Sequence, residues 1–234
     1  MEYSINIEEK GKTKDFNLTD YEKEEGGGFY YKKNIDFNNT HYDLIGVGCR
    51  YKLVLSIYSV GIYYQNQEKV IDNNLQEILN NNSKKILLLK FYREVDILNM
   101  VSALNGAFKK RMTDENNDNE KIYKNLLYFE WILKKFIPEG LKQHDELIFE
   151  WENNKLNIYI GNNEKNIKKS YFYEKIKDNL TPSNNFHKKI GEVEDENICR
   201  ILFDCYLDDQ SVAYSIKYSI NKFMLTNKNN YHNE

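Results

Sequence analysis

Residues 44–64 read LIGVGCRYKLVLSIYSVGIYY, and this stretch decides how the chain can fold. It is rich in Val, Ile, Leu and Tyr, the residue types that favour a pleated, partly buried strand. Arg50 lies inside this otherwise apolar segment. Because an unpaired buried guanidinium is very costly, Arg50 must reach the surface, pair with a carboxylate, donate to several carbonyls, or bind an anion at the mouth of an apolar cleft.

Tyr58 follows Arg50 by eight residues, an even number, so in one strand both side chains would point to the same face. In one extended strand the two residues would stand about 26 Å apart. They can share a site only if the chain turns back within residues 52–55. Otherwise Tyr58 is an ordinary core or sheet tyrosine.

The rest of the chain alternates between strand and helix patterns. The apolar run at 85–92 predicts a central buried strand. Asp96 can N-cap a helix that runs to Met112, with apolar residues at i, i+3, i+4 and i+7. Further helices are expected at 67–80, 122–136, 171–180, 198–207 and 212–225, a hairpin at 146–152 and 156–160, a mobile loop at 181–197 and a frayed tail at 226–234.

No internal repeat or linker interrupts these patterns. We therefore expect a single domain over residues 1–234. Its predicted fold class is α+β, with a largely antiparallel sheet and helices packed on one face.

The composition excludes several functional classes. The 33 basic and 36 acidic residues give a net charge of -3, without the basic footprint of most nucleic-acid binders. The 41% of hydrophobic residues can fill a core, but no apolar run is long enough to span a membrane. The N-terminus shows no signal or transit peptide. The three cysteines form no CxxC pair, which favours buried thiols in the cytoplasm or another reducing compartment.

The common catalytic and metal-binding motifs are missing from the sequence. The four histidines show no metal-ligand spacing, and nothing points to a cofactor. Gly46-Val47-Gly48 resembles part of a dinucleotide-binding fingerprint. However, the third glycine is missing, and a strand follows where a helix should begin.

The segment Gly46-Xaa-Gly48-Xaa-Arg50, followed by YSVGIY at 58–63, resembles the core signature of the chalcone isomerase-like superfamily. The resemblance covers residues 40–225 and continues, in order, through 87–92, 96–112, GLKQHDELIFEW at 140–151, 155–162 and YLDDQSV at 206–212. It implies an open-faced β-sandwich, in which a long antiparallel sheet carries a layer of helices. The implied site is an apolar cleft between the sheet and the helices.

The superfamily contains enzymes that cyclise chalcones to flavanones and non-catalytic members that bind fatty acids. Arg50 matches the arginine that the enzymes place at the glycine-rich turn. Tyr58 and Cys205 stand where the enzymes have threonines. If Asn105 is the family's asparagine, Leu98 replaces its tyrosine. The resemblance thus implies a ligand site of four residues without the enzymes' hydroxyl network: Arg50, Tyr58, Asn105 and Cys205.

These departures favour a non-catalytic binding protein for a fatty acid or similar apolar carboxylate. Such a ligand requires a cation, a hydroxyl and an apolar channel. Chalcone cyclisation additionally requires donors for developing enolate charge. The alternatives are a chalcone isomerase-type intramolecular lyase, with Arg50 as its catalytic residue, and a structural or protein-interaction role. The candidate channel residues are Leu53, Leu55, Ile57, Leu88, Met100, Leu104, Phe108 and Leu202.

Overall fold

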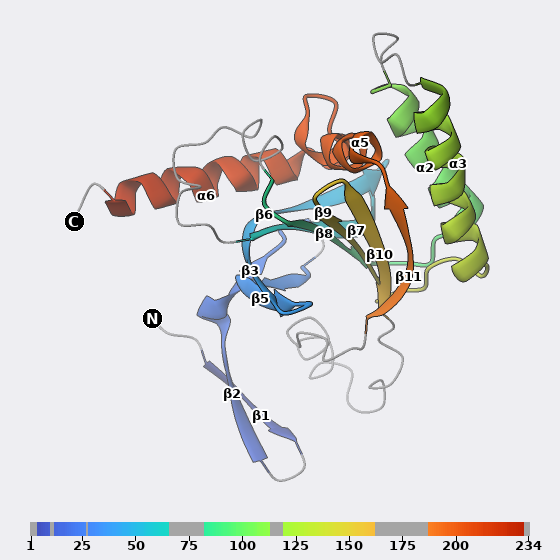
Figure 1. Ribbon diagram of the computed structural model, residues 1–234. Helices are drawn as coiled ribbons and strands as arrows, with labels where there is room; N and C mark the ends of the chain where they lie inside the picture. The colour runs from blue at the N-terminus through green and yellow to red at the C-terminus, as the bar shows by residue number, and fades with distance from the viewer. Residues whose placement is uncertain are drawn as a thin grey trace.

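A curled seven-stranded sheet forms the centre of the molecule (Figure 1). The computed structural model describes residues 4–9, 12–26, 28–65, 82–112, 119–161 and 187–231. The strands follow the order β11-β10-β9-β8-β7-β6-β5, and every neighbouring pair is antiparallel. Their bounds are Asn34–Phe37 (β5), Thr40–Lys52 (β6), Leu55–Gln65 (β7), Lys85–Phe91 (β8), Glu146–Glu152 (β9), Lys155–Gly161 (β10) and Lys188–Glu194 (β11).

The remaining described elements are four α-helices, one 3-10 helix and two small hairpins. The helices are Ile97–Lys109 (α2), Asn119–Phe136 (α3), Glu196–Leu207 (α5) and Ser215–Tyr231 (α6). The other elements are Ser4–Glu9 (β1), Lys12–Asn17 (β2), Leu18–Asp20 (η1), Tyr21–Lys23 (β3) and Tyr30–Lys32 (β4), with β1 paired to β2 and β3 to β4. The predicted α+β class is confirmed.

The β6–β7 hairpin contains the turn on which a shared Arg50–Tyr58 site depends. Leu53 and Val54 connect the two strands, and Leu53 takes a φ of 58°, which is uncommon for a residue with a side chain. The chain therefore reverses within the predicted residues 52–55. As a result, Arg50 and Tyr58 are register partners on adjacent strands.

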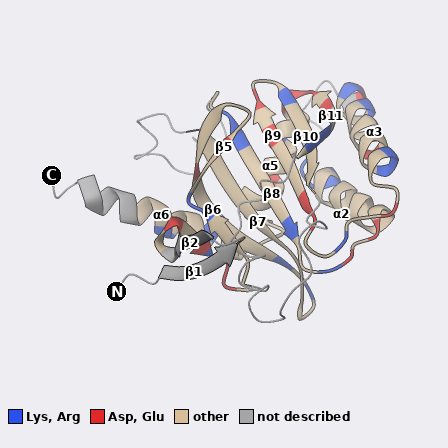
Figure 2. Ribbon diagram, turned by 90° about the horizontal axis from the view of Figure 1, so that it is seen from below, with Lys and Arg blue, Asp and Glu red and all other residues tan. Residues whose placement is uncertain are grey.

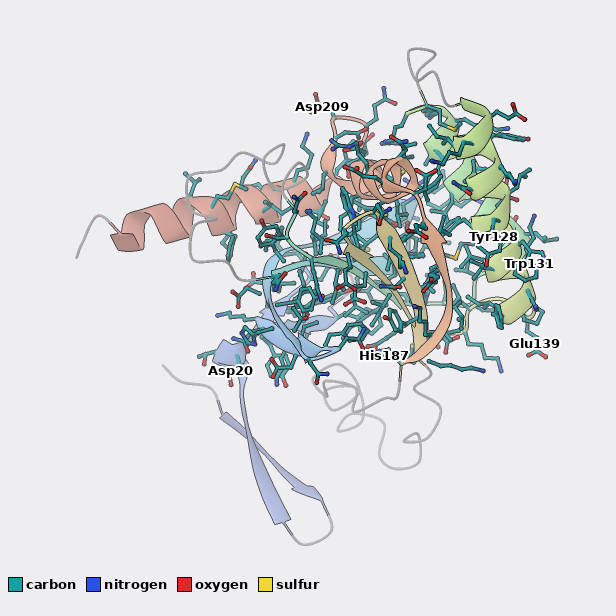
Figure 3. All side chains as sticks on the ribbon, viewed as in Figure 1. Asp20, Tyr128, Trp131, Glu139, His187 and Asp209 are labelled. Atoms are coloured by element: carbon teal, nitrogen blue, oxygen red, sulfur yellow. The ribbon has the colours of Figure 1, made fainter. Side chains whose placement is uncertain are left out.

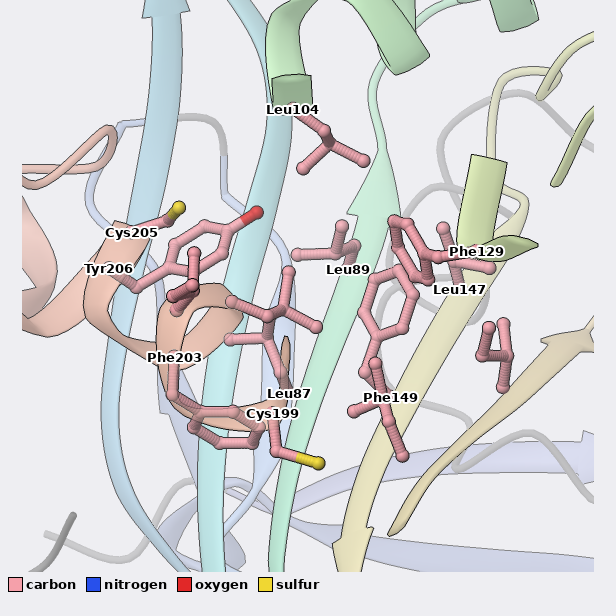
Figure 4. Packing of buried hydrophobic residues seen from close by; sticks show 14 of the residues in the cluster. Leu87, Leu89, Leu104, Phe129, Leu147, Phe149, Cys199, Phe203, Cys205 and Tyr206 are labelled. Atoms are coloured by element: carbon pink, nitrogen blue, oxygen red, sulfur yellow. The ribbon is translucent and has the colours of Figure 1, made fainter. Parts of the chain in front are cut away.

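The helices cover one face of the sheet. Successive side chains of β8 point to opposite faces of the sheet. Leu87 and Leu89 point to the helical face, and Ile86 and Leu88 point to the other face. Figure 4 shows Leu87 near Phe203 of α5 and Leu89 on the side of Phe129 of α3, within the same buried cluster. The second face is covered by aromatic residues, among them Phe29, Tyr31, Tyr42, Tyr63 and Tyr159. The predicted single helical layer is confirmed.

The two glycines of the Gly46-Val47-Gly48 segment allow α6 to approach β6 closely. A Cβ added to Gly48 would lie 2.7 Å from the backbone nitrogen of Ile216, and one on Gly46 would lie 2.3 Å from Cγ1 of Ile220. The amides between and after these glycines donate to α6 hydroxyls: Val47 N to Ser219 Oγ and Cys49 N to Ser215 Oγ, both at 3.0 Å. The Gly46-Val47-Gly48 segment is thus the place where strand β6 packs against helix α6.

One prediction about the C-terminal third was wrong, and one expected helix is longer than predicted. The expected mobile loop at 181–197 contains strand β11, and Asp195 N-caps α5 through the amides of Asn197 and Ile198. A β-bulge separates the buried residues Ile190 and Val193 by three positions, which hides the two-residue period. Helix α6 extends to Tyr231, six residues beyond the helix expected at 212–225, and residues 232–234 of the expected frayed tail lie outside the described residues.

The other expected elements agree with the structure where it describes them. Asp96 N-caps α2, and Asn153 and Asn154 form the turn between β9 and β10. The helices expected at 67–80 and 171–180 lie outside the described residues. Among the described helices, none is long and apolar enough to cross a membrane.

Candidate functional site

A cavity of about 370 Å³ lies between the β6–β7–β8 part of the sheet and helices α2 and α5. Its walls come from six segments of the chain: Arg50 and Lys52 of β6, Ile57 and Tyr58 of β7, residues 91–96, residues 99–107 of α2, Cys205 of α5, and Val212. Figure 4 shows Leu104, Cys205 and Tyr206 in this region. The volume falls within the range of small-molecule sites in proteins.

Arg50 is half-buried at the wall of this cavity. Its Nη1 donates to the carbonyl oxygen of Val212 at 2.9 Å. No carboxylate of the described residues lies within ion-pair distance of its guanidinium. Since a guanidinium carries five N–H donors, one carbonyl leaves capacity for an anion. This excludes one of the partners that the sequence left open for Arg50, namely a carboxylate among the residues that the structure describes.

The loop that accepts from Arg50 is held by a second arginine. Arg111, just beyond α2, donates from Nε and Nη2 to the two carboxylate oxygens of Asp208, at 2.7 and 2.8 Å. Nη2 also donates to the carbonyl of Gln210 at 2.9 Å. A bidentate pair of this kind fixes direction as well as distance. Arg111 therefore positions the loop that contacts Arg50.

Tyr58 lies beside Arg50 and forms a hydroxyl pair with α5. Its Oη is 3.1 Å from Oη of Tyr206, which is fully buried. Burial raises the pKa of Tyr58 from 10.0 to about 12, although Tyr206 and the charge of Arg50 both act in the opposite direction. Burial also raises the pKa of Tyr206 well above its ordinary value. Both hydroxyls are therefore protonated donors at neutral pH.

Cys205 lines the same cavity from α5. Burial raises the pKa of its thiol from 9.0 to about 12, against the lowering effect of nearby Arg111. The sulfur is thus a neutral thiol at physiological pH, and such a thiol is neither a good nucleophile nor a strong hydrogen-bond donor. Cys205 shapes the wall of the cavity.

Asn105 is placed differently from the prediction. It is absent from the cavity lining and lies in a separate hollow between α2 and α3, where its Nδ2 donates to Glu130 Oε1. Asn99 instead supplies an amide to the cavity from the first turn of α2. The cavity-facing residues of α2 are Asn99, Met100, Ala103, Leu104 and Ala107, a set of positions that α-helical geometry places on one face. The expected placement of Asn105 is corrected.

The apolar wall also differs in part from the expected channel. Ile57, Met100 and Leu104 line the cavity as predicted, and Phe91 joins them. The other expected residues do not: Leu53 and Leu55 are exposed at the hairpin turn, Leu88 lies on the opposite face of the sheet, and Phe108 and Leu202 are buried in the core. Residue type alone identified these side chains as apolar without showing which face they occupy.

Sequence reasoning missed Tyr206 and Asn99. Tyr206 begins the YLDDQSV segment, so its position was noted, but nothing in the sequence shows that its hydroxyl meets Tyr58. The cavity lining contains four further charged residues, Lys52, Arg93, Glu94 and Asp96, of which only Asp96 was singled out from the sequence, as a helix N-cap. Arg93 Nε donates to the carbonyl of Ser56 at 2.8 Å. Within the described ranges, no three His, Cys, Asp or Glu side chains gather as a metal site.

Comparisons with known proteins agree with this architecture. A family model described as chalcone isomerase-like matches residues 23–179. Among solved structures, the chain is similar to a fatty-acid binding protein from Arabidopsis thaliana, with a TM-score of 0.57 and 15% sequence identity. The similarity covers 88% of this chain and 97% of the plant protein. At this identity the likeness concerns the fold. No curated protein sequence matches the chain.

Proposed function

The chain belongs to the chalcone isomerase-like family, and we propose that it is a non-catalytic binding protein for a fatty acid or a similar apolar carboxylate. One observation carries this proposal: Arg50 and Tyr58 stand side by side at the wall of an otherwise largely apolar cavity between sheet and helices. A carboxylate with a hydrocarbon tail has the same division into a charged head and an apolar body.

In the proposed complex, the carboxylate accepts hydrogen bonds from Arg50 and from the hydroxyl of Tyr58. Hydrogen bonds between a guanidinium and a carboxylate are about twice as strong as neutral ones. The tail runs along Ile57, Met100 and Leu104, which belong to the apolar lining of the same cavity. Loss of water from this wall supplies the apolar part of the binding free energy.

The lyase alternative has less support from the same residues. It needs donors aimed at the oxygen on which enolate charge develops. Cys205 is a neutral thiol at the expected threonine position, and Leu98 is 63% exposed and does not line the cavity. The Tyr58–Tyr206 pair is the remaining hydroxyl group at the site. Conversion of a chalcone to a flavanone is therefore measured as well, as the result that would favour the lyase.

The test measures binding of dodecanoate and hexadecanoate to delipidated protein by calorimetry. Arg50→Ala should weaken binding by about 1.5–3 kcal/mol, the range for a hydrogen bond to a charged group. Arg200→Ala is the matched control, because Arg200 lies on α5 and does not line the cavity. Dodecanol, which lacks the carboxylate, should bind wild type weakly and be insensitive to Arg50→Ala.

Two results would overturn the proposal. The first is equal affinity of wild type and Arg50→Ala for both acids. The second is conversion of a chalcone to a flavanone at a rate that Arg50→Ala abolishes, together with no detectable fatty-acid binding. Native mass spectrometry of protein purified from its host gives an independent readout, since a carrier is expected to retain co-purified lipid.

A further inference from the structure

The outer face of α3 carries an unusual density of exposed aromatic residues. The inner face packs into the core through Leu126, Phe129, Ile132 and Leu133. Tyr123, Leu127, Tyr128, Trp131 and Phe136 are between 41% and 50% exposed, and helical spacing places Leu127, Tyr128 and Trp131 on the side opposite the core. Figure 3 shows Tyr128 and Trp131 projecting from α3 on the side away from the sheet. Packing of the core therefore does not account for these side chains.

Lysines frame the aromatic residues along this helix. Lys124, Tyr128, Trp131 and Lys135 follow one line, at spacings of four, three and four residues. The Tyr128 and Trp131 rings stack with centroids 5.6 Å apart and an interplanar angle of 16°. Lys135 Nζ lies 4.3 Å from the centroid of the Trp131 ring. The result is an ordered aromatic centre with a cation at each end.

The charge of this face is opposite to that of the whole chain. Residues 119–136 contain four lysines and two glutamates, a net charge of +2, whereas the chain as a whole carries -3. One of the glutamates, Glu130, is already used by Lys134 at 3.0 Å and by Asn105. Figure 2 shows the basic residues near both ends of α3. The outer face is thus locally basic on an acidic protein.

We propose that this outer face of α3 docks the protein onto an anionic lipid membrane. Trp and Tyr prefer the boundary between headgroups and hydrocarbon, and lysines near a membrane surface are attracted to anionic lipids. A protein partner is a poorer fit, because the buried centres of protein interfaces are depleted of lysine. The aromatic residues enter the interface while the lysines contact the headgroups.

The position of the face relative to the cavity is consistent with this role. Helix α2 packs against α3 on one side and lines the cavity with Asn99 and Ala103, both exposed, on another. Docking through α3 would therefore bring the rim of the cavity close to the lipid surface. The docking itself needs no ligand in the cavity, so its test is independent of the proposed carrier function.

The experiment is co-sedimentation of the full chain with two kinds of vesicle, one of phosphatidylcholine alone and one of phosphatidylcholine mixed with anionic phosphatidylserine. Binding to the anionic vesicles is expected, and it should fall when salt is raised. Lys124→Gln/Lys135→Gln should reduce the partition coefficient by about tenfold or more. Tyr128→Ser/Trp131→Ser should reduce it to a similar or greater extent.

Matched controls separate the α3 face from general surface effects. Lys23→Gln/Lys33→Gln changes the net charge equally at β3–β4, and Tyr214→Ser/Tyr218→Ser removes two exposed tyrosines from around α6. Both should bind vesicles like wild type. In addition, Trp131 fluorescence should shift to the blue on binding and be quenched by brominated lipid, whereas Trp151 is buried and should not respond.

The proposal is overturned by any of three results. The first is equal binding of wild type to anionic and neutral vesicles. The second is binding like wild type by the two α3 variants, with both folded by circular dichroism. The third is a dimeric wild type and a monomeric Tyr128→Ser/Trp131→Ser by light scattering, which would mean that the face joins two copies of this chain.

Discussion

Arg50 and Tyr58 are register partners on strands β6 and β7, and both side chains reach the same cavity. Although a β-bulge follows directly between Arg50 and Tyr51, the two residues stand on adjacent paired strands, and a sheet fixes the separation of such partners more firmly than a loop does. The cation and the hydroxyl are therefore held in place before any ligand arrives. Preorganisation of this kind lowers the entropic cost of binding.

The hydroxyl of Tyr58 should contribute to acid binding without being needed for folding. Tyr58→Phe removes one donor and leaves the aromatic ring beside Phe91. We expect dodecanoate binding to weaken by about 0.5–1.5 kcal/mol, the net value of one hydrogen bond. Calorimetry measures this directly. Tyr206→Phe is the control, because its hydroxyl reaches the cavity only through Tyr58, and a loss as large as that of Tyr58→Phe would contradict the direct role.

Obstruction of the cavity rim should abolish binding of the tail. Ala103 is exposed on α2 and lines the cavity, so Ala103→Trp places a large ring at the entrance at little cost in packing. The neighbouring Ser102 is also exposed but lines the separate α2–α3 hollow. Ser102→Trp is therefore the matched control and should bind like wild type. Equal affinities for the two variants would place the ligand elsewhere.

The sequence predicts the sheet-and-hairpin part of the site better than the helical part. A turn within residues 52–55 follows from the need of Arg50 and Tyr58 to meet, and strand parity then places both on one face. Helical periodicity locates α2 just as well, but it cannot say which polar residue faces the cavity. Asn99 and Asn105 are both near the apolar stripe, and only tertiary packing against α3 separates them.

Strand β11 shows a second limit of prediction from sequence patterns, after the choice between Asn99 and Asn105. Its bulge shifts the period of the buried residues, and the strand therefore looks like a polar loop. The Tyr58–Tyr206 contact is a third limit, since 148 residues separate its partners along the chain. Contacts of this range depend on how α5 crosses the sheet, which local sequence does not encode.

The close approach of α6 to β6 makes Gly48 sensitive to substitution. Gly48→Ala would place its Cβ 2.7 Å from the backbone nitrogen of Ile216, so the helix must move. We expect a loss of about 1–3 kcal/mol in the free energy of unfolding, as for other overpacked sites. Urea denaturation gives the value. Gly106→Ala is the control: nothing lies within 4 Å of its Cβ, and in a helix it should stabilise by up to about 1 kcal/mol.

Alkaline pH should lower the stability of the fold because two buried cysteine thiols ionise less readily in the folded chain than in the unfolded chain. The pKa of Cys205 is raised from 9.0 to about 12 by burial, and that of Cys49 from 9.0 to about 11. In the unfolded chain these thiols release their protons at lower pH than in the folded chain. Stability is therefore complete below pH 9 and falls as pH rises towards 12, by about 1.4 kcal/mol per pH unit for each such group.

Cys205→Ala tests whether Cys205 contributes to this loss. Urea unfolding followed by circular dichroism between pH 9.5 and 11.5, a window set by the two pKa values, should show a shallower fall in the variant, by about 1.4 kcal/mol per pH unit. Ile201→Val is the control: it trims the same helix without removing a titratable group, so it should lower stability and keep the wild-type slope. A wild-type slope in Cys205→Ala would show that the thiol ionises equally in both states and is not buried as described.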